Sequence, residues 1–258
     1  MIDGELSRDR HLDWEGCWNV RDLGGLPVGS GTTAWGQLIR ADCLGKLTAS
    51  GRRALYDYGV RTVVDLRGPL ELADDPPIFP GGRAGEPGFV NTPLDHQDPA
   101  AAPLWAVVRE RADVYRLFLD FYPRALAGAL RAVVEAPPGG IVFHCLGGTD
   151  RTGLVAAALL RLAGVPDEDI AADYALTRER RRPIYERLVA EKGESGLGFW
   201  DRLNMTADQM LATLAHVDER YGGFEAYLLA AGLTADDLAQ LRARLLSPLP
   251  LRQDQGED

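Results

Sequence analysis

Cysteine is scarce in this chain of 258 residues, which has only Cys17, Cys43 and Cys145. Three widely spaced cysteines cannot form a disulfide framework, and no two of them have the spacing of a zinc site. Positive charge is also in deficit: 28 Lys and Arg residues stand against 38 Asp and Glu residues, so the formal net charge is -10. An acidic chain lacks the broad basic surface that non-specific nucleic-acid binding requires, so we expect no nucleic-acid partner.

Long hydrophobic runs are missing as well. The longest strongly apolar stretch, residues 154 to 162, is interrupted by Arg161 and is too short to span a bilayer. The chain starts with a polar, acidic segment, unlike the basic and apolar segments of a secretory signal. We therefore expect a cytoplasmic protein without stable membrane insertion, and the pattern predicts no oligomeric state. The composition, with 46% hydrophobic and 26% charged residues, is typical of a globular protein.

Hydrophobic periodicity predicts strands alternating with helices in the first two thirds of the chain, and helices alone in the last third. Short strands are predicted at residues 36 to 41, 62 to 66, 89 to 94 and 141 to 144. Helices are predicted after the N-cap Thr48 and at 234 to 246, where Thr234 is the N-cap. Another is predicted at 104 to 134, with a kink or break at Pro123. The remaining predicted helices are at 151 to 163, 167 to 178, 183 to 191, 206 to 220 and 223 to 231.

The stretch at residues 68 to 88 is rich in proline and glycine, which predicts a loop. Strand–helix alternation followed by further helices favours a single α/β domain, over residues 1 to 247, with extra C-terminal helices. Residues 248 to 258 are predicted to form an acidic, flexible tail.

The segment VFHCLGGTDRTGL, residues 142 to 154, carries the candidate chemistry. A predicted strand ends at Cys145, a loop with two glycines follows, and a helix begins near Arg151. Loop amides that precede a helix N-terminus form a nest of donors suited to phosphate, and the same donors favour a thiolate. Arg151, six positions after Cys145, adds a planar fork that binds two phosphoryl oxygens.

A buried cysteine at the end of a strand is commonly inert packing, so Cys145 has a structural alternative. The functional interpretation is favoured because this cysteine occurs together with other residues typical of such a loop: His144, Gly147, Asp150, Thr152 and Gly153. Neither Cys17 nor Cys43 has an arginine at the sixth position after it. We therefore predict Cys145 as the one reactive thiol.

The loop HCLGGTDRTG resembles HCxxGxxRT/SG, the signature of cysteine-dependent protein tyrosine phosphatases. Its DRTG form is similar to the bacterial and fungal branch with HCxxGKDRTG, which includes mycobacterial and listerial tyrosine/lipid phosphatases. Further segments resemble that branch, so the likeness extends over residues 14 to 246: NVRDLGG at 19 to 25, LIRAD at 38 to 42, GVRTVVDLR at 59 to 67 with Glu71, DYALT at 173 to 177, and YGG at 221 to 223. The resemblance implies a tyrosine-phosphatase-like α/β fold with a mostly parallel central sheet flanked by helices.

The resemblance also implies the roles of individual residues. Cys145 would attack phosphorus and form a phosphocysteine. Arg151 and the loop amides would bind the phosphoryl oxygens; the loop positions are Leu146, Gly147, Gly148, Thr149, Asp150 and Arg151. Thr152 would donate to the sulfur, and His144 would orient the loop and tune the thiol. No metal or cofactor is required.

The implied activity is that of a protein tyrosine phosphatase. The substrate is a phosphoprotein or a small phosphomonoester: phosphotyrosine, with phosphoserine and phosphothreonine as further candidates. A phosphoinositide or another small phosphomonoester is the alternative substrate. A phospho-binding module on the same fold is the non-enzymatic alternative, and it predicts loss of the cysteine or the arginine, both of which this chain has.

The general acid has two candidates. Asp150 is favoured in this branch because it lies beside the leaving group, and its structural alternative is a salt bridge or a helix N-terminal carboxylate. Asp95 is the alternative acid.

The sequence departs from the branch at Thr149, where lysine is usual, which weakens the case for phosphoinositides. Four arginines on a later predicted helix have two interpretations. They either supply positive charge to a substrate from a distance or form a solvated helix face: Arg178, Arg180, Arg181 and Arg182. Residues 179 to 212 fit either a helical lid over the site or extra helices packed on the core.

Overall fold

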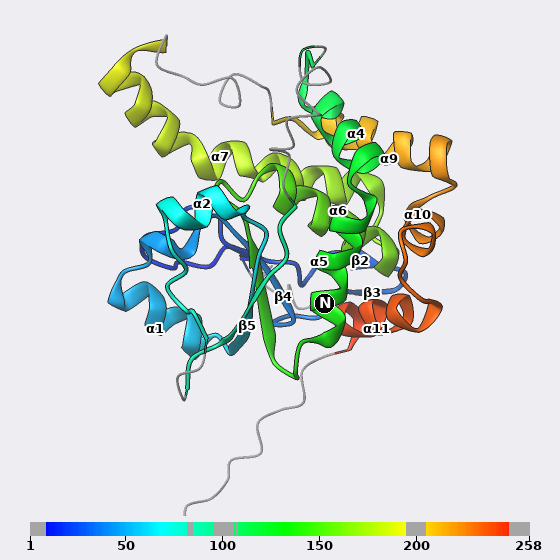
Figure 1. Cartoon of the computed structure of the whole chain (residues 1–258), viewed down its shortest axis with the longest axis horizontal. Helices are drawn as coiled ribbons and strands as arrows, with labels where there is room; N and C mark the ends of the chain where they lie inside the picture. Colours follow the sequence, from blue (N-terminus) through cyan, green and yellow to red (C-terminus); the bar gives the residue numbers. More distant parts are fainter. Residues whose placement is uncertain (1–8, 82–84, 95–105, 107, 195–204, 248–258) are drawn as a thin grey trace, which may run out of the picture.

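A five-stranded sheet forms the centre of the protein, with strand order β1-β4-β7-β5-β6 (Figure 1). The computed structural model describes residues 9–81, 85–94, 106, 108–194 and 205–247. The strands are β1 (Arg21–Asp22), β4 (Leu38–Ala41), β7 (Gly140–His144), β5 (Val60–Asp65) and β6 (Gly88–Asn91). Only the pairing of β1 with β4 is antiparallel in this sheet. The predicted mostly parallel sheet flanked by helices is therefore confirmed.

Side chains along each strand point alternately to the two faces of the sheet, so the core has one part on each face. In β7, Val142 packs in one apolar cluster, together with Leu55 of helix α1 (Ala49–Asp57). Its neighbours Ile141 and Phe143 pack in the larger cluster on the other face. Figure 1 shows α1 on one side of the sheet and most of the other helices on the opposite side. The larger cluster also includes residues of the C-terminal third, such as Leu214 and Leu241, so those helices belong to the same core.

The helices of the larger face include two that meet at a proline. Helix α4 (Arg111–Phe121) ends before Tyr122, and α5 (Pro123–Glu135) starts at Pro123, as the sequence predicts. The others are α6 (Asp150–Ala163), α7 (Asp167–Lys192), α9 (Ala207–Tyr221), α10 (Phe224–Ala230) and α11 (Ala235–Leu246). Smaller elements are the hairpin of β2 (Pro27–Val28) with β3 (Gly31–Thr32) and the 3-10 helix η1 (Leu44–Lys46).

Two helix starts carry the predicted side-chain caps. Thr48 Oγ1 accepts a hydrogen bond from the Gly51 amide at 3.1 Å, and Thr234 Oγ1 accepts one from the Asp237 amide at 3.1 Å. Each bond satisfies an amide that has no partner within its own helix. Both boundaries are local signals, which is why the sequence alone identifies them.

The predicted loop at 68 to 88 is wrong in part, because helix α2 (Pro69–Asp74) begins there. Pro69 occupies the first helical position, where its fixed φ favours a helix and its missing N–H costs nothing. Glu71 Oε2 accepts a hydrogen bond from the Gly68 amide at 2.9 Å, which closes the first turn. The proline that suggested a loop is therefore the residue that starts a helix.

The predicted break between residues 178 and 183 is also wrong, since α7 continues through Pro183. A proline inside a helix removes the hydrogen bond to the carbonyl four residues earlier, here that of Glu179. Both residues are exposed, so water can hydrate this carbonyl. Figure 1 shows the C-terminal part of α7 extending past the sheet.

Some predictions fall on residues that the structure does not describe. Residues 195–204, within the predicted lid, and the tail 248–258 lie outside the described residues, and so does Asp95. The lid and the single-domain boundaries stay predictions. Within the described part of the chain, no helix is both long enough and apolar enough to cross a membrane.

Candidate active site

The segment that carries the candidate chemistry connects a buried strand to a buried helix. Strand β7 ends at His144, Cys145 follows it directly, and α6 begins at Asp150. Cys145 is only 3% exposed, whereas the next residue, Leu146, is 56% exposed. Gly148 has φ of 64°, and a Cβ there would lie 2.6 Å from the carbonyl oxygen of Ala41. Only glycine fits at this turn of the loop.

The carbonyl groups of the loop are held from one side. Asn19 Nδ2 donates to the carbonyl oxygens of Gly147 (3.2 Å) and Gly148 (3.0 Å), and Arg40 Nη2 donates to that of Gly148 (2.9 Å). In a trans peptide the N–H points opposite to the carbonyl, so the amides of Gly148 and Thr149 point to the other side. The loop therefore presents donors where an anion can bind.

The residues behind the loop are fixed by one buried carboxylate. Asp173, on α7, accepts hydrogen bonds at Oδ1 from Arg21 Nε (3.0 Å) and Arg10 Nη1 (2.7 Å), and at Oδ2 from Arg40 Nη1 (2.7 Å). Burial alone would raise the pKa of Asp173, but the three guanidinium groups hold it well below its usual range. This cluster joins the N-terminal arm, β4 and α7 at the loop.

Arg151 is 7% exposed and lies in the first turn of α6. Its Nη1 and Nη2 donate to Oε2 and Oε1 of Glu71 at 2.5 and 2.6 Å. Although burial opposes the charged form, Glu71 raises the pKa of Arg151 above its usual range. The guanidinium is therefore charged and held in one orientation. Glu71 lies on α2, so the helix that sequence reasoning missed positions the predicted phosphate-binding arginine.

His144 and Thr152 lie on either side of the loop in sequence and are both buried. His144 Nδ1 is 3.1 Å from the carbonyl oxygen of Cys145, and its Nε2 is 3.6 Å from Asp65 Oδ2. Burial lowers the pKa of His144 even though Asp65 acts in the opposite direction, so the ring is neutral at pH 7. Thr152 Oγ1 is buried and has no hydrogen-bond partner among the described residues.

Asp150, the first residue of α6, binds two side chains of α4. The Tyr115 hydroxyl donates to Oδ1 at 3.0 Å, and Arg111 forms an ion pair with the same oxygen. Asp150 Oδ2 makes no hydrogen bond within the described residues. Sequence reasoning missed Arg111 and Tyr115. Their spacing of four residues, which places both on one face of a helix, was the available signal.

Comparison with known sequences decides the family. The sequence model of the tyrosine phosphatase family matches residues 12–247. The chain belongs to the tyrosine phosphatase family. It is a protein-tyrosine phosphatase, as the loop predicts.

Several bacterial relatives support this assignment. A tyrosine-protein phosphatase of Nostoc commune is 29% identical over 232 residues, covering 80% of this chain and 73% of the relative. A Cupriavidus necator protein, provisionally named a tyrosine-protein phosphatase, is 30% identical over 254 residues, which cover 92% of this chain and 89% of the relative. The triple specificity protein phosphatase PtpB of Mycobacterium tuberculosis is 26% identical over 279 residues and covers 90% and 97%. The expected likeness to mycobacterial phosphatases is confirmed.

The other two thiols of the phosphatase lie outside the loop and in different surroundings. Burial, together with a hydrogen bond to Asp75 Oδ2 at 3.0 Å, raises the pKa of Cys43 to about 12. Burial likewise raises the pKa of Cys17. Both are therefore protonated at neutral pH. In the part of the chain that the structure describes, no three His, Cys, Asp or Glu side chains are grouped to hold a metal ion.

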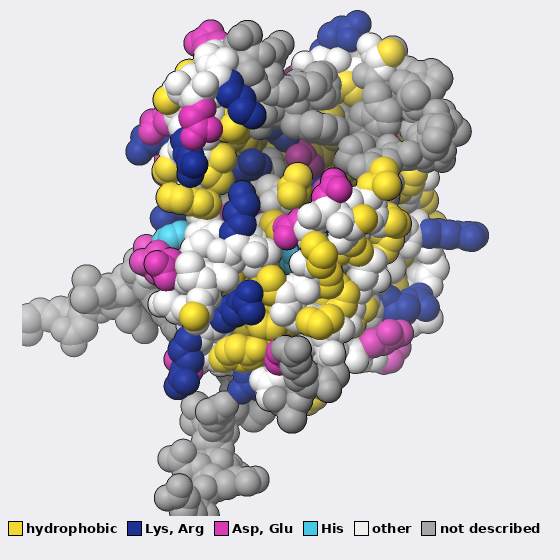
Figure 2. All heavy atoms as spheres, turned by 60° about the vertical axis from the view of Figure 1, so that its left-hand side comes forward, with side chains coloured by type: hydrophobic (Ala, Val, Ile, Leu, Met, Phe, Trp, Pro, Cys, Tyr) yellow, Lys and Arg dark blue, Asp and Glu magenta, His cyan; other side chains and the backbone are white. Residues whose placement is uncertain are grey.

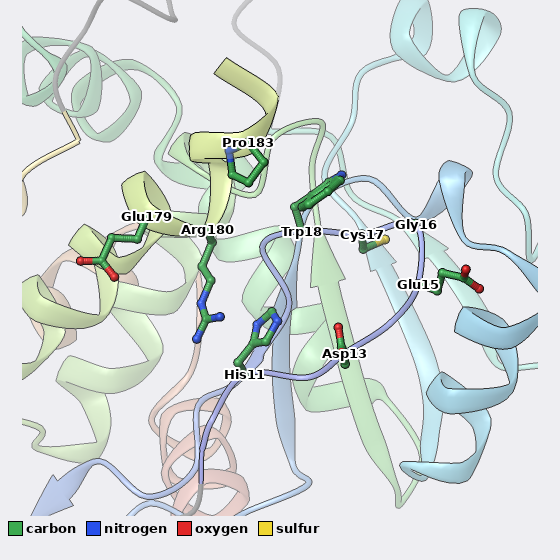
Figure 3. Close-up of a pocket in the computed structure, with 9 residues that line it drawn as sticks. All are labelled: His11, Asp13, Glu15, Gly16, Cys17, Trp18, Glu179, Arg180 and Pro183. Atoms are coloured by element: carbon green, nitrogen blue, oxygen red, sulfur yellow. The ribbon is translucent and has the colours of Figure 1, made fainter. Parts of the chain in front are cut away.

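A cavity of about 450 Å³ lies between the N-terminal arm and α7 of the phosphatase (Figure 3). Arg180 extends from α7 toward the segment that carries His11, and Trp18 lies near Pro183. Acidic side chains also line this cavity, at Asp13, Glu15 and Glu179. On the face of the molecule that Figure 2 presents, Lys and Arg side chains are interspersed with acidic, apolar and neutral ones and form no continuous basic surface.

Proposed function

We propose that this phosphatase hydrolyses phosphotyrosine through a phosphocysteine on Cys145. The observation that carries the proposal is the combination of a charged, oriented Arg151 with loop amides turned toward one side, directly after a buried cysteine. We extend the proposal to phosphoserine and phosphothreonine, because a relative that spans most of the chain is named a triple specificity phosphatase.

In the first step, the Cys145 thiolate attacks phosphorus while the ester P–O bond breaks. The loop amides and the Arg151 guanidinium bind the non-bridging oxygens as charge moves to the leaving oxygen. In the second step, water attacks the phosphocysteine, the P–S bond breaks, and inorganic phosphate leaves. The unpaired Thr152 hydroxyl is available to donate a hydrogen bond to the departing thiolate.

We assign the general acid to Asp150. The hydrogen bond from Tyr115 and the ion pair with Arg111 both use Oδ1, so they fix the carboxyl group without occupying Oδ2. Oδ2 would give its proton to the leaving oxygen in the first step and take one from the attacking water in the second. The ion pair that offered a structural alternative for Asp150 is thus compatible with the catalytic role.

The thiol assignment is tested with Cys145→Ser and, as the matched control, Cys17→Ser. Because only Cys145 follows β7 into the loop, turnover of phosphotyrosyl peptides and of phenyl phosphate should fall below detection in Cys145→Ser and persist in Cys17→Ser. Vanadate should inhibit the wild type. Hydrolysis that is independent of Cys145 or insensitive to vanadate would contradict the proposal.

The acid assignment is tested with Asp150→Asn on aryl phosphates of graded leaving-group pKa. General-acid catalysis contributes about 10²- to 10⁴-fold, and the loss should be largest for the poorest leaving group. The slope of log kcat against leaving-group pKa should therefore steepen in the variant. Wild-type rates on phenyl phosphate would exclude Asp150 and leave Asp95 as the candidate acid.

A further inference from the structure

Arg181 of α7 contacts the phosphate-binding loop directly. Its Nη1 donates to Thr149 Oγ1 at 2.9 Å. The same nitrogen lies 2.1 Å from the place that a Cβ on Gly147 would occupy. A side chain at position 147 would therefore displace the guanidinium, and the glycine admits it against the loop.

The charge of Arg181 is not neutralised by an ion pair with any described carboxylate. Other arginines at the loop each have such a partner: Arg151 with Glu71, Arg40 with Asp173, and Arg111 with Asp150. The guanidinium of Arg181 instead lies 5.2 Å from the centre of the Tyr185 ring, a cation–π contact that holds its position.

Asp42 is a buried acidic residue whose pKa is affected by the charge of Arg181. Burial raises the pKa of Asp42, whereas the amides of Asn19 and Trp18 and, to a smaller extent, Arg181 lower it. The two carboxylate oxygens accept hydrogen bonds from these amides at 3.0 Å. The hydrogen bonds of the Asp42 carboxylate are therefore to the N-terminal arm, and no ion pair joins it to Arg181.

One donor of Arg181 lacks a hydrogen-bond partner within the described part of the chain. Arg181 Nε is buried and makes no hydrogen bond with the residues that the structure describes. Buried donors are nearly always satisfied, so an orphaned guanidinium nitrogen beside a phosphate-binding loop indicates a place for an acceptor. A guanidinium binds carboxylate and phosphoryl oxygens through paired N–H donors, which makes an anion the matching acceptor.

We propose that Arg181 binds a second anionic group, a carboxylate or a phosphoryl group carried on the leaving group of the substrate, next to the phosphate that is cleaved. The inference rests on the proposed hydrolysis at the Cys145 loop. It makes Arg181 a specificity-determining residue: substrates with a neighbouring negative charge are preferred over neutral aryl phosphates.

The test compares phenyl phosphate with 3-carboxyphenyl phosphate and with 1,3-phenylene bisphosphate, so that one arm carries a carboxylate and one a second phosphoryl group. The variants are Arg181→Gln, Arg181→Lys and the control Arg182→Gln. Arg182 is 72% exposed and pairs with Glu186 on the same helix, so its substitution removes one charge away from the loop.

In the wild type, kcat/KM should be higher for at least one anionic arm than for phenyl phosphate. Arg181→Gln should reduce this ratio about tenfold, mainly through KM, because charge-assisted hydrogen bonds are lost from the bound substrate. Arg181→Lys should restore part of the ratio, and Arg182→Gln should keep it. If Arg181→Gln lowers the kcat/KM ratio for only one of the two anionic substrates, the proposal is supported, and that substrate identifies the anionic group that Arg181 binds.

Two results would overturn the inference: a wild type without any preference for the anionic arms, or an equal loss on all three substrates in Arg181→Gln. The second result would mean that Arg181 only braces Thr149. Calorimetric binding of the same three compounds to Cys145→Ser, with and without Arg181→Gln, gives the comparison without turnover. Failure of hydrolysis would count against the proposed function, while the binding ratio would still decide the role of Arg181.

Discussion

The arginines at the proposed phosphate-binding loop, residues 145 to 151, differ in their partners. Arg40 and Arg151 are buried, and each is paired with a carboxylate, Asp173 or Glu71. Arg181 touches the same loop but has no carboxylate partner in the described part of the chain. Burying a guanidinium is costly unless it is paired, so the carboxylates hold Arg40 and Arg151 in fixed orientations. The partly exposed Arg181 can keep its charge for a ligand.

The largest effect should come from Asp173→Asn, which removes the shared partner of three guanidinium groups. Breaking a buried ion pair costs about 3–5 kcal/mol because it leaves uncompensated charge behind, so the free energy of unfolding should fall by about that amount at pH 7. Denaturant unfolding measures this change. Arg53→Ala is the control: the pair of Arg53 with Asp57 is exposed (78% and 61%), and its loss should cost about 0–1 kcal/mol.

The loss of stability in Asp173→Asn should depend on pH. Because the folded pKa of Asp173 is depressed, its stabilisation is complete above the unfolded pKa of about 3.9 and is lost as the pH falls through the folded value. The difference in unfolding free energy between wild type and Asp173→Asn should therefore narrow below about pH 4. If the difference in unfolding free energy stayed constant down to the pH of acid unfolding, the three arginines would not be held by the charge of Asp173.

A smaller effect is expected from Glu71→Gln, which keeps the size of the side chain but removes the charge that orients Arg151. Misplacement of a positioning group by about 1 Å costs up to about 10²-fold in rate, so kcat/KM for phenyl phosphate should fall about 10- to 100-fold. Glu186→Gln, on the exposed part of α7, is the matched control. Unchanged kcat/KM in Glu71→Gln would show that Arg151 needs no partner to hold its orientation.

The ion pairs of the site also show which features of the protein can be predicted from the sequence alone. The strands at the centre of the sheet, the caps Thr48 and Thr234, and the loop after β7 were all predictable. Each depends on side chains within a few residues of one another: alternating apolar residues, or one hydroxyl and a nearby amide. The errors at Pro69 and Pro183 have the same local origin, because proline occurs at helix starts and on exposed helix faces as well as in loops.

The candidate site combines residues that are close together in the sequence with partners that are far away in it. Its core, Cys145 followed by a glycine turn and Arg151, occupies one continuous segment, so the sequence alone was enough to identify the candidate loop and the family. The partners come from far along the chain: 80 residues separate Arg151 from Glu71, and 152 separate Arg21 from Asp173. No periodicity or motif reports such pairs, because they form only when packing of the sheet and helices removes water around the charges and makes pairing necessary. Tertiary structure alone decided which arginines pair with carboxylates, and that Arg181 contacts the loop without a carboxylate partner among the described residues.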